Sequence, residues 1–283
     1  MPRRRSPWRL VLALLVLAAV GAGVAAAVAG RSGETGSASA PDGPTGTAPG
    51  TPSASPSTTP APPPPPLAGR TVVLDPGHNR DNGRHPGQIN RQVDAGGFAK
   101  ACNTTGTATN SGVPEATVNW ELAQEVRVRL EALGARVVLT RQEDAGWGPC
   151  IDERAAVANR EGAALLLSLH ADGVAPGAHG FHVIHPGLRP GWTDDIVVAS
   201  GQAAVAVRDA LVAGGLTPAT YTGSEGLDER SDLGTLNNAD VPAVMLEAGN
   251  LRHAGDAALL TDPAGRARIA DALAVAVSRF LAG

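Results

Sequence analysis

The 283-residue chain has almost no lysine and few aromatic residues. Lys100 is its only lysine beside 22 arginines, aromatic residues make up 3% of the chain, and the formal net charge is −4. From residue 68 onward, 18 basic residues stand against 25 acidic ones. Nucleic-acid binding depends on a basic surface and often on stacking aromatic side chains, so this composition argues against a nucleic-acid partner.

The first 30 residues have the pattern of an export signal. Four arginines between positions 3 and 9 precede Leu10–Gly30, a run of 21 uncharged residues. A cleaved signal peptide and a retained membrane anchor both fit, because Ala27-Val28-Ala29 resembles a cleavage site while a run of this length can also span a bilayer. We expect an exported protein of the cell envelope, periplasmic or extracellular, with membrane contact only through this segment.

Residues 31–67 consist mainly of Pro, Ser, Thr, Ala and Gly. Such a segment buries too little apolar surface to offset its ordering entropy, so we expect a disordered linker. The remaining residues, 68–283, are enough for one well-buried α/β domain.

Three apolar runs each stop just before a polar residue. Short continuous apolar runs are typical of strands buried on both faces of a mostly parallel sheet, with helices crossing between them. Ligands bind at the carboxyl edge of such sheets, so the three polar side chains are expected at one edge. The runs are Thr71–Leu74 before Asp75-Pro76-Gly77-His78, Ala163–Leu169 before His170, and Pro242–Leu246 before Glu247.

A fourth candidate lies on a helix. Apolar residues at helical spacing predict a helix that starts near Pro114, and Glu115 falls at the start of its buried face. An inward-facing carboxylate needs a partner such as a cation or a metal, although a first-turn Glu can also simply favour the helix dipole. Glu121 falls on the opposite face and is expected to be solvated.

Two imidazoles and one carboxylate form the ligand set of a hydrolytic zinc site, in which the fourth position is left for water. His78, His170 and Glu115 would supply this set for one zinc ion. Glu247 is then a second carboxylate that is available to move protons.

The chain resembles the zinc-dependent N-acetylmuramoyl-L-alanine amidases of the type-3 family across residues 70–282. Six motifs occur in the family's order, and together they are far more specific than any one alone. They are Val73–His78, Glu115, Val138–Arg141, Arg154 with Ala158-Asn159, Ser168–Ala171, and Pro242–Glu247.

The resemblance implies a mostly parallel sheet flanked by helices in one catalytic domain, with zinc on His78, Glu115 and His170 and with Glu247 as the catalytic acid/base. It also implies that the substrate is peptidoglycan or its muropeptide fragments, cut at the amide between N-acetylmuramic acid and L-alanine. Arg154 matches a motif that we interpret as packing around the site. We expect a monomer.

Two further residues are candidates for substrate contact. Arg80 stands where many members of the family have glycine, and it could reach an anionic substrate group. His182 lies in a predicted strand, Gly180–His185, and could line the groove. A helix over residues 194–212 and a loop are expected to fill the chain up to Pro242, which leaves the active site open rather than plugged by a helix.

Cys102 and Cys150 are the only two cysteines. Since an exported chain meets an oxidising compartment, we expect them to form a disulfide that joins the Gly-rich insert after Cys102 to the loop before Ile151. Without a CxxC pair they make a poor metal site.

Two other functions remain open on the sequence. Another zinc peptidase, cutting within the stem peptide, would use the same metal site. An inactive wall-binding module is the second alternative, but it predicts a lost ligand or a lost glutamate, and none is missing here.

Overall fold

The computed structural model describes residues 63–282. The expected export segment and most of the expected linker lie outside these residues. Within the described part, no helix is both long enough and apolar enough to cross a membrane.

A six-stranded, mostly parallel sheet forms the centre of the domain. Its strands follow the order β4 (Arg136–Leu139), β1 (Thr71–Pro76), β5 (Leu165–Asp172), β8 (Ala243–Asn250), β6 (His182–Pro186) and β7 (Leu227–Arg230). The first four strands are parallel to one another, whereas β6 pairs antiparallel with β8 and β7 follows β6 in parallel. The predicted α/β fold with helices around a mostly parallel sheet is confirmed.

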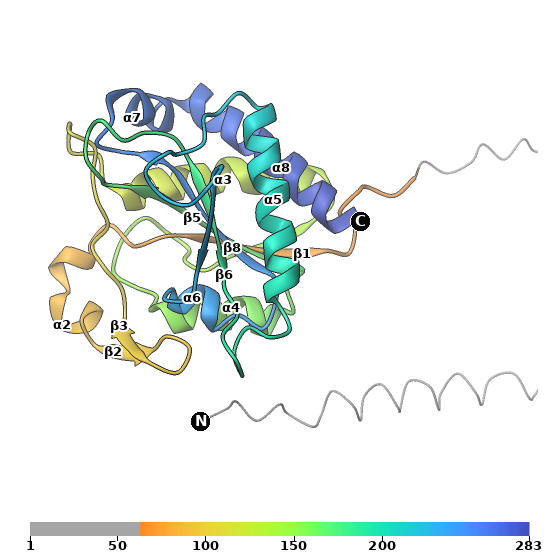
Figure 1. Ribbon diagram of the computed structural model, residues 1–283, viewed down its shortest axis with the longest axis horizontal. Coiled ribbons are helices and arrows are strands. Elements are labelled where there is room, and N and C mark those ends of the chain that lie inside the picture. Colours follow the sequence, from red (N-terminus) through yellow and green to blue (C-terminus); the bar gives the residue numbers. More distant parts are fainter. Residues whose placement is uncertain (1–62, 283) are drawn as a thin grey trace, which may run out of the picture. The chain divides into compact units, whose positions relative to one another are not determined.

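Helices cover the two faces of the sheet unequally (Figure 1). The long helices α3 (Glu115–Ala132), α5 (Val197–Ala213) and α8 (Pro263–Ala282) pack on one face, and α7 (Ala254–Thr261) joins α8. Among residues 63–282, the helices on the other face are α4 (Ile151–Glu161) and the one-turn α6 (Gly234–Asn237). Successive side chains of a strand point to opposite faces of the sheet, so neighbouring residues contact different helix layers.

The folded domain begins earlier than the sequence composition suggests. Leu67, which we expected at the end of the linker, is fully buried among residues of the core around α3, and its backbone N–H donates to the carbonyl of Leu133 at 2.9 Å. A lone leucine after five prolines shows no periodic pattern. Its burial comes from core residues of other elements, which lie beside it only in the folded chain.

The elements after β5 agree in part with the sequence pattern. The predicted strand near Gly180–His185 is found as β6, and the helix expected over 194–212 is α5. The segment expected to be a loop contains β7 and α6. A four-residue strand with three charged residues, Leu227–Arg230, gives no apolar run, but it needs none because it lies at the edge of the sheet.

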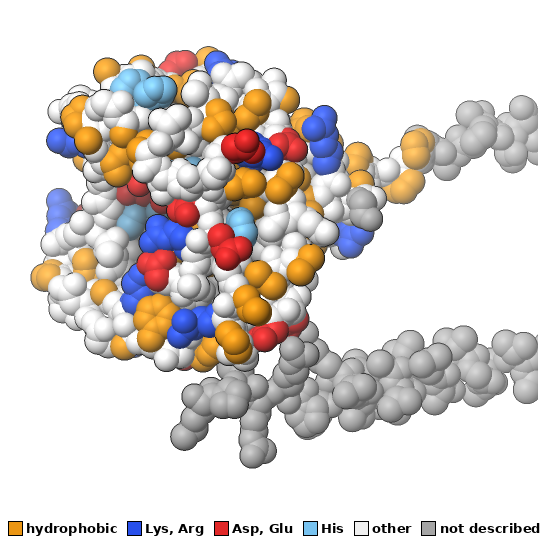
Figure 2. Space-filling view, in the orientation of Figure 1, with side chains coloured by type: hydrophobic (Ala, Val, Ile, Leu, Met, Phe, Trp, Pro, Cys, Tyr) orange, Lys and Arg blue, Asp and Glu red, His pale blue; other side chains and the backbone are white. Residues whose placement is uncertain are grey.

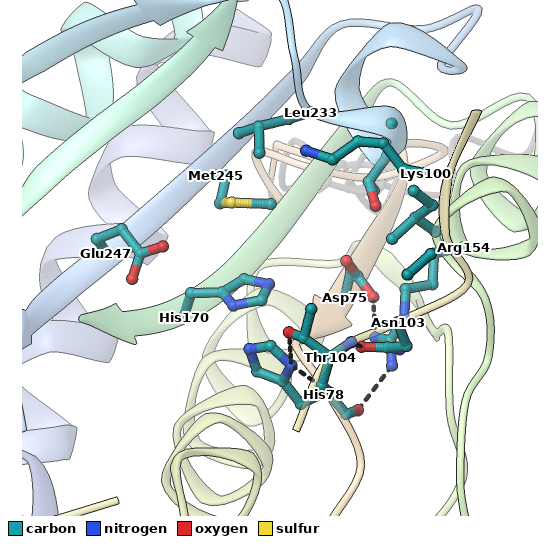
Figure 3. A pocket seen from close by; sticks show the side chains of 14 residues that line it. Asp75, His78, Lys100, Asn103, Thr104, Arg154, His170, Leu233, Met245 and Glu247 are labelled. Atoms are coloured by element: carbon teal, nitrogen blue, oxygen red, sulfur yellow. Dashed lines mark hydrogen bonds and ion pairs between the residues drawn. The ribbon is translucent and has the colours of Figure 1, made fainter. Parts of the chain in front are cut away.

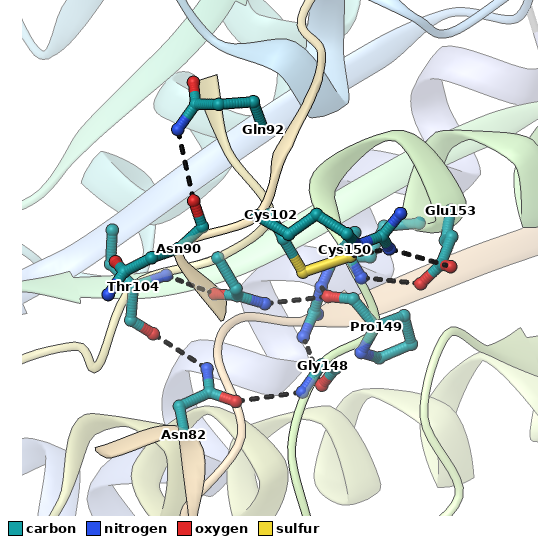
Figure 4. The surroundings of a disulfide bond; sticks show 12 residues. Asn82, Asn90, Gln92, Cys102, Thr104, Gly148, Pro149, Cys150 and Glu153 are labelled. Atoms are coloured by element: carbon teal, nitrogen blue, oxygen red, sulfur yellow. Dashed lines mark hydrogen bonds and ion pairs between the residues drawn. A yellow bond between two sulfur atoms is a disulfide. The ribbon is translucent and has the colours of Figure 1, made fainter. Parts of the chain in front are cut away.

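A small hairpin, β2 (Gln92–Asp94) with β3 (Ala99–Ala101), projects beside the sheet close to the short elements η1 (Asn82–Arg84) and α2 (Pro86–Ile89). The predicted disulfide between Cys102 and Cys150 is present and fully buried (Figure 4). It joins the end of the hairpin to the residue that caps the N-terminus of α4. The N–H of Ile151 also donates to the carbonyl of Cys102 at 2.8 Å, so two covalently distant segments run side by side here.

Replacing both cysteines with serine should lower the free energy of unfolding by about 4 kcal/mol, because the cross-link closes a loop of about 50 residues in the unfolded chain. Urea unfolding of the oxidised protein and of the double variant measures this difference. Thiol alkylation without reductant checks the premise, since labelling of both sulfurs in the native protein would contradict the disulfide.

Candidate functional site

The three strands with polar ends lie next to one another in the sheet, in the order β1, β5, β8. His78 lies two residues after the end of β1, and His170 and Glu247 lie opposite each other in the register of β5 and β8. Both side chains point to the face that carries α4 and α6, because their neighbours Leu169 and Leu246 belong to the core on the other face. The expectation that these residues meet at one edge is confirmed.

Glu115 completes a compact cluster from the first residue of α3. Its Oε1 atom lies 3.2 Å from Nε2 of His78 and 3.0 Å from Nδ1 of His170. One ligand atom from each of the three residues lies within 4.8 Å of the others, and among residues 63–282 this is the one such group that could hold a metal ion. Burial alone would raise the pKa of Glu115, but the two imidazoles outweigh it and hold the pKa well below its ordinary value.

Backbone contacts fix the orientation of two members of this cluster, His78 and Glu115. Nδ1 of His78 lies 3.1 Å from the carbonyl oxygen of Thr104, which can only accept, so Nδ1 donates to it and Nε2 is the nitrogen that faces Glu115. The side-chain amide of Asn82 donates to the same carbonyl at 2.7 Å. The Oε2 atom of Glu115 accepts from the N–H of Thr107 at 2.9 Å.

Two glycines leave the room that the cluster needs. A Cβ atom at Gly77 would lie only 2.2 to 2.6 Å from atoms of the His170 ring. At Gly106, where φ is +74°, a Cβ would lie 2.9 Å from both Glu115 Oε2 and His78 Cδ2. Any larger residue at these positions therefore has to displace a member of the cluster.

Arg154 holds the turn that carries His78. All five of its N–H donors are used: they reach the Asp75 carboxylate and the carbonyls of Pro76, His78, Gly148 and Pro149. His78 itself has φ +59°, a left-handed conformation that is costly for a non-glycine residue, and its carbonyl is fixed by Arg154 at 2.6 Å. The interpretation of Arg154 as a residue that packs around the site is supported by these bonds.

Asp75 is fully buried under the site. Besides Arg154, it accepts from the hydroxyls of Thr140 at 2.6 Å and Ser168 at 2.7 Å. Burial by itself would raise the pKa of Asp75, but the guanidinium and the two hydroxyls together lower it below its ordinary value. The carboxylate thus stays charged inside the protein.

Glu247 is half-buried and has other carboxylates close by. Burial and the charges of Glu115 and Asp172 raise the pKa of Glu247 well above its ordinary value. A carboxyl group that gains and loses a proton closer to neutral pH suits general acid/base chemistry.

Two cavities of about 260 Å³ each meet at this site, and both are lined by His78, Thr104, His170 and Glu247. One, which we name the Lys100 cavity, extends toward Lys100, Ile151, Leu233 and Met245 (Figure 3). The other, the threonine cavity, is lined by Thr105, Thr107, Asp172 and Gly173. Figure 2 shows charged side chains of both signs gathered around histidines on this face of the molecule.

Neither of the two residues expected to contact substrate lines these cavities. Arg80 is half exposed, and its guanidinium lies 4.0 Å from Asp144 Oδ2. His182 is 3% exposed, because it stands opposite Glu247 in the antiparallel register of β6 and β8, and its ring contacts Tyr221 and approaches Asp172. Their positions do not support direct substrate contact.

Lys100 and Thr104 line the cavities, but no sequence motif marks them and the sequence did not predict their place there. Glu121 is exposed, as expected, and its carboxylate also pairs with Arg266 at 3.0 Å. No residue of α5, the long helix between β6 and β8, lines either cavity, which agrees with the expected open site.

Comparison with known proteins agrees with this geometry. A family model described as Amidase_3, N-acetylmuramoyl-L-alanine amidase, matches residues 72–279. The chain belongs to this amidase family.

Characterised relatives cover nearly the whole described domain. The N-acetylmuramoyl-L-alanine amidase Rv3717 of Mycobacterium tuberculosis is 43% identical over 217 residues, which are 76% of this chain and 88% of the relative. Crystal structures of the amidase Ami1 from Mycobacterium smegmatis and, in its apo form, from Mycobacterium abscessus match with TM-scores of 0.71 and 0.72. Their identities are 43% and 44%, and each match covers 76% of this chain and 98% or 100% of the other.

Gly77→Ala should displace the His170 ring and weaken metal binding by at least tenfold, because the new methyl group overlaps the ring. Isothermal titration with zinc measures the affinity, and circular dichroism confirms that the protein is folded. Gly87→Ala is the matched control, since a Cβ at Gly87 meets nothing within 4 Å. Equal zinc affinity in both variants would contradict the assigned cluster.

Asp75→Asn should lower the free energy of unfolding at pH 7 by about 3–5 kcal/mol, because it leaves the buried Arg154 guanidinium without its counter-ion. The pKa of Asp75 is lower in the folded than in the unfolded protein. The carboxylate therefore contributes fully to the free energy of unfolding above the unfolded pKa of about 3.9, and this contribution is lost as pH falls through the folded pKa. Urea unfolding at pH 7, 5 and 3 should therefore show a smaller pH dependence in the variant. Parallel curves for the two proteins would argue against this role.

Proposed function

We propose that this protein is a zinc-dependent amidase that hydrolyses the bond between N-acetylmuramic acid and the L-alanine of the peptidoglycan stem peptide. The observation that carries the proposal is the convergence of His78, Glu115 and His170 on one point, with Glu247 opposite His170 on the next strand. Membership of the amidase family supplies the substrate class.

The donor set fits zinc. Two imidazole nitrogens and one carboxylate oxygen converge from three separate elements, and the ring of His78 already presents Nε2 because Nδ1 is bound to a backbone carbonyl. Bound there, zinc would supply a Lewis acid that polarises a carbonyl group and makes water more acidic. His78, Glu115 and His170 are the proposed ligands, for one ion per domain.

Glu247 is the proposed acid/base. Its position beside the cluster allows the carboxylate to accept a proton from the attacking water and then to give a proton to the departing amide nitrogen. Water adds to the lactyl carbonyl carbon, and the C–N bond breaks. The products are a free lactyl carboxyl group and the free amino group of L-alanine.

The proposal also covers where the protein acts. Residues 1–30 would export it as a cleaved signal or a membrane anchor, the linker before Leu67 would space it from the membrane, and the catalytic domain would meet peptidoglycan or its fragments as a monomer. The buried disulfide supports an oxidising compartment.

Digestion of purified muropeptides by the zinc-loaded protein tests the reaction, with products identified by mass. Release of the intact stem peptide is expected, and chelation of the metal should stop it. Cleavage between two residues of the stem peptide would instead identify a peptidase, and complete inactivity would favour a wall-binding module.

Glu247→Gln should lower kcat by a factor of at least 10² while zinc affinity stays within about twofold, because a proton-transfer group contributes about 10²- to 10⁴-fold. His78→Ala and His170→Ala should lose zinc and activity together. Zinc content by atomic absorption and product release by chromatography separate the two classes of variant. Loss of zinc from Glu247→Gln would place this residue among the ligands.

A further inference from the structure

The two cavities that meet at Glu247 differ in chemistry. The threonine cavity has hydroxyl groups and backbone in its walls, no Lys or Arg, and the three carboxylates of Glu115, Asp172 and Glu247. The Lys100 cavity has apolar walls from Ile151, Leu233 and Met245. It contains two cations and two carboxylates, of which Asp75 is paired with Arg154 and Glu247 is shared with the threonine cavity. An amide that is cut at their junction must place its acyl half in one cavity and its amine half in the other.

Lys100 is the cation in the Lys100 cavity that can still bind a ligand. Arg154, the other one, has all five donors committed to Asp75 and to backbone carbonyls. The Lys100 ammonium donates to the backbone carbonyl of Asp232 at 2.8 Å and lies 3.5 Å from its carboxylate, and its side chain is 37% exposed. An ammonium has three donors, so at least one remains. Figure 3 shows its nitrogen directed toward Leu233.

The surroundings of Lys100 favour an anion. Asp232, its one acidic contact, is already held by Arg230 through two bonds of 2.8 and 2.9 Å. Asp232 is thus shared between two cations, Lys100 and Arg230, although the charges of Asp228 and Glu247 also act on Arg230. A ligand carboxylate is attracted here and repelled by the carboxylates of the threonine cavity.

We propose that the Lys100 cavity binds the peptide half of the substrate and that Lys100 binds the free α-carboxylate of the second residue of the stem peptide. This inference rests on the proposed amidase function. The muramoyl sugar then lies along the threonine cavity, where hydroxyl and backbone groups suit an uncharged sugar. Lys100 determines specificity and takes no part in bond breaking.

The second residue is the first one that can offer such a carboxylate. The carboxyl group of L-alanine is used in the next amide bond, whereas the following D-glutamate is linked through its side chain and keeps its α-carboxyl group, either free or amidated. The apolar walls of the Lys100 cavity suit the alanine methyl group. Its volume, about 260 Å³, leaves room for only the first residues of the peptide.

Two muramoyl dipeptides that differ only in this group test the proposal: N-acetylmuramoyl-L-Ala-D-Glu with a free α-carboxylate, and N-acetylmuramoyl-L-Ala-D-isoglutamine with the amide. Wild type should cleave the acid with about tenfold higher kcat/KM, the size expected for a hydrogen bond to a charged group. Lys100→Met should reduce the preference to about one by slowing the acid alone, and Lys100→Arg should keep most of it. Raising the salt concentration should narrow the wild-type preference.

Arg84→Met is the matched control, because Arg84 is 81% exposed at the side chain and lines neither cavity. It should leave the preference unchanged. Equal cleavage of both substrates by wild type, an unchanged preference in Lys100→Met, or an equal loss on both substrates would overturn the role of Lys100 while leaving the amidase intact. Failure of the zinc-loaded wild type to release lactyl-linked peptide from either substrate would instead overturn the proposed function.

Discussion

The buried pair of Arg154 and Asp75 is the constraint on which the rest of the site depends. Taking two charges out of water is costly, and the cost is offset here because every donor of the guanidinium and both carboxylate oxygens have partners. Those partners include the carbonyls of the β1 turn, so the same bonds that satisfy the charges hold His78 in an otherwise unfavourable backbone conformation. The buried ion pair thus determines the backbone conformation of His78 in the site.

Local patterns were enough to predict the strand ends, Glu115, Glu247 and the disulfide. In each case the signal is contained in a short stretch of sequence, such as an apolar run that stops at a histidine or a glutamate at the start of a helix. The resemblance to a family then assigned a role to each residue. Because β1, β5 and β8 are neighbours in the sheet, the polar residues at their ends come together at one site.

What the sequence could not show depends on contacts through space. The need for glycine at positions 77 and 106 comes from rings and carboxylates that belong to other elements. Lys100 and Thr104 have no local signature, and they reach the site because the hairpin and the disulfide carry them there. His182 was expected near the substrate, but it is buried where β6 pairs with β8, and the sequence of this strand alone does not reveal that pairing.

The reversal of β6 has a consequence for how such a domain can diversify. An antiparallel strand begins at the edge where its parallel neighbours end, so the connection from Asp172 to His182 lies beside the ends of β5 and β8. Asn250, at the end of β8, anchors this loop through the carbonyls of Ala175 and Ala178. A change in the length of this loop would alter the rim of the site without shifting any strand. Proteins with this fold can therefore acquire a new substrate range through this connection.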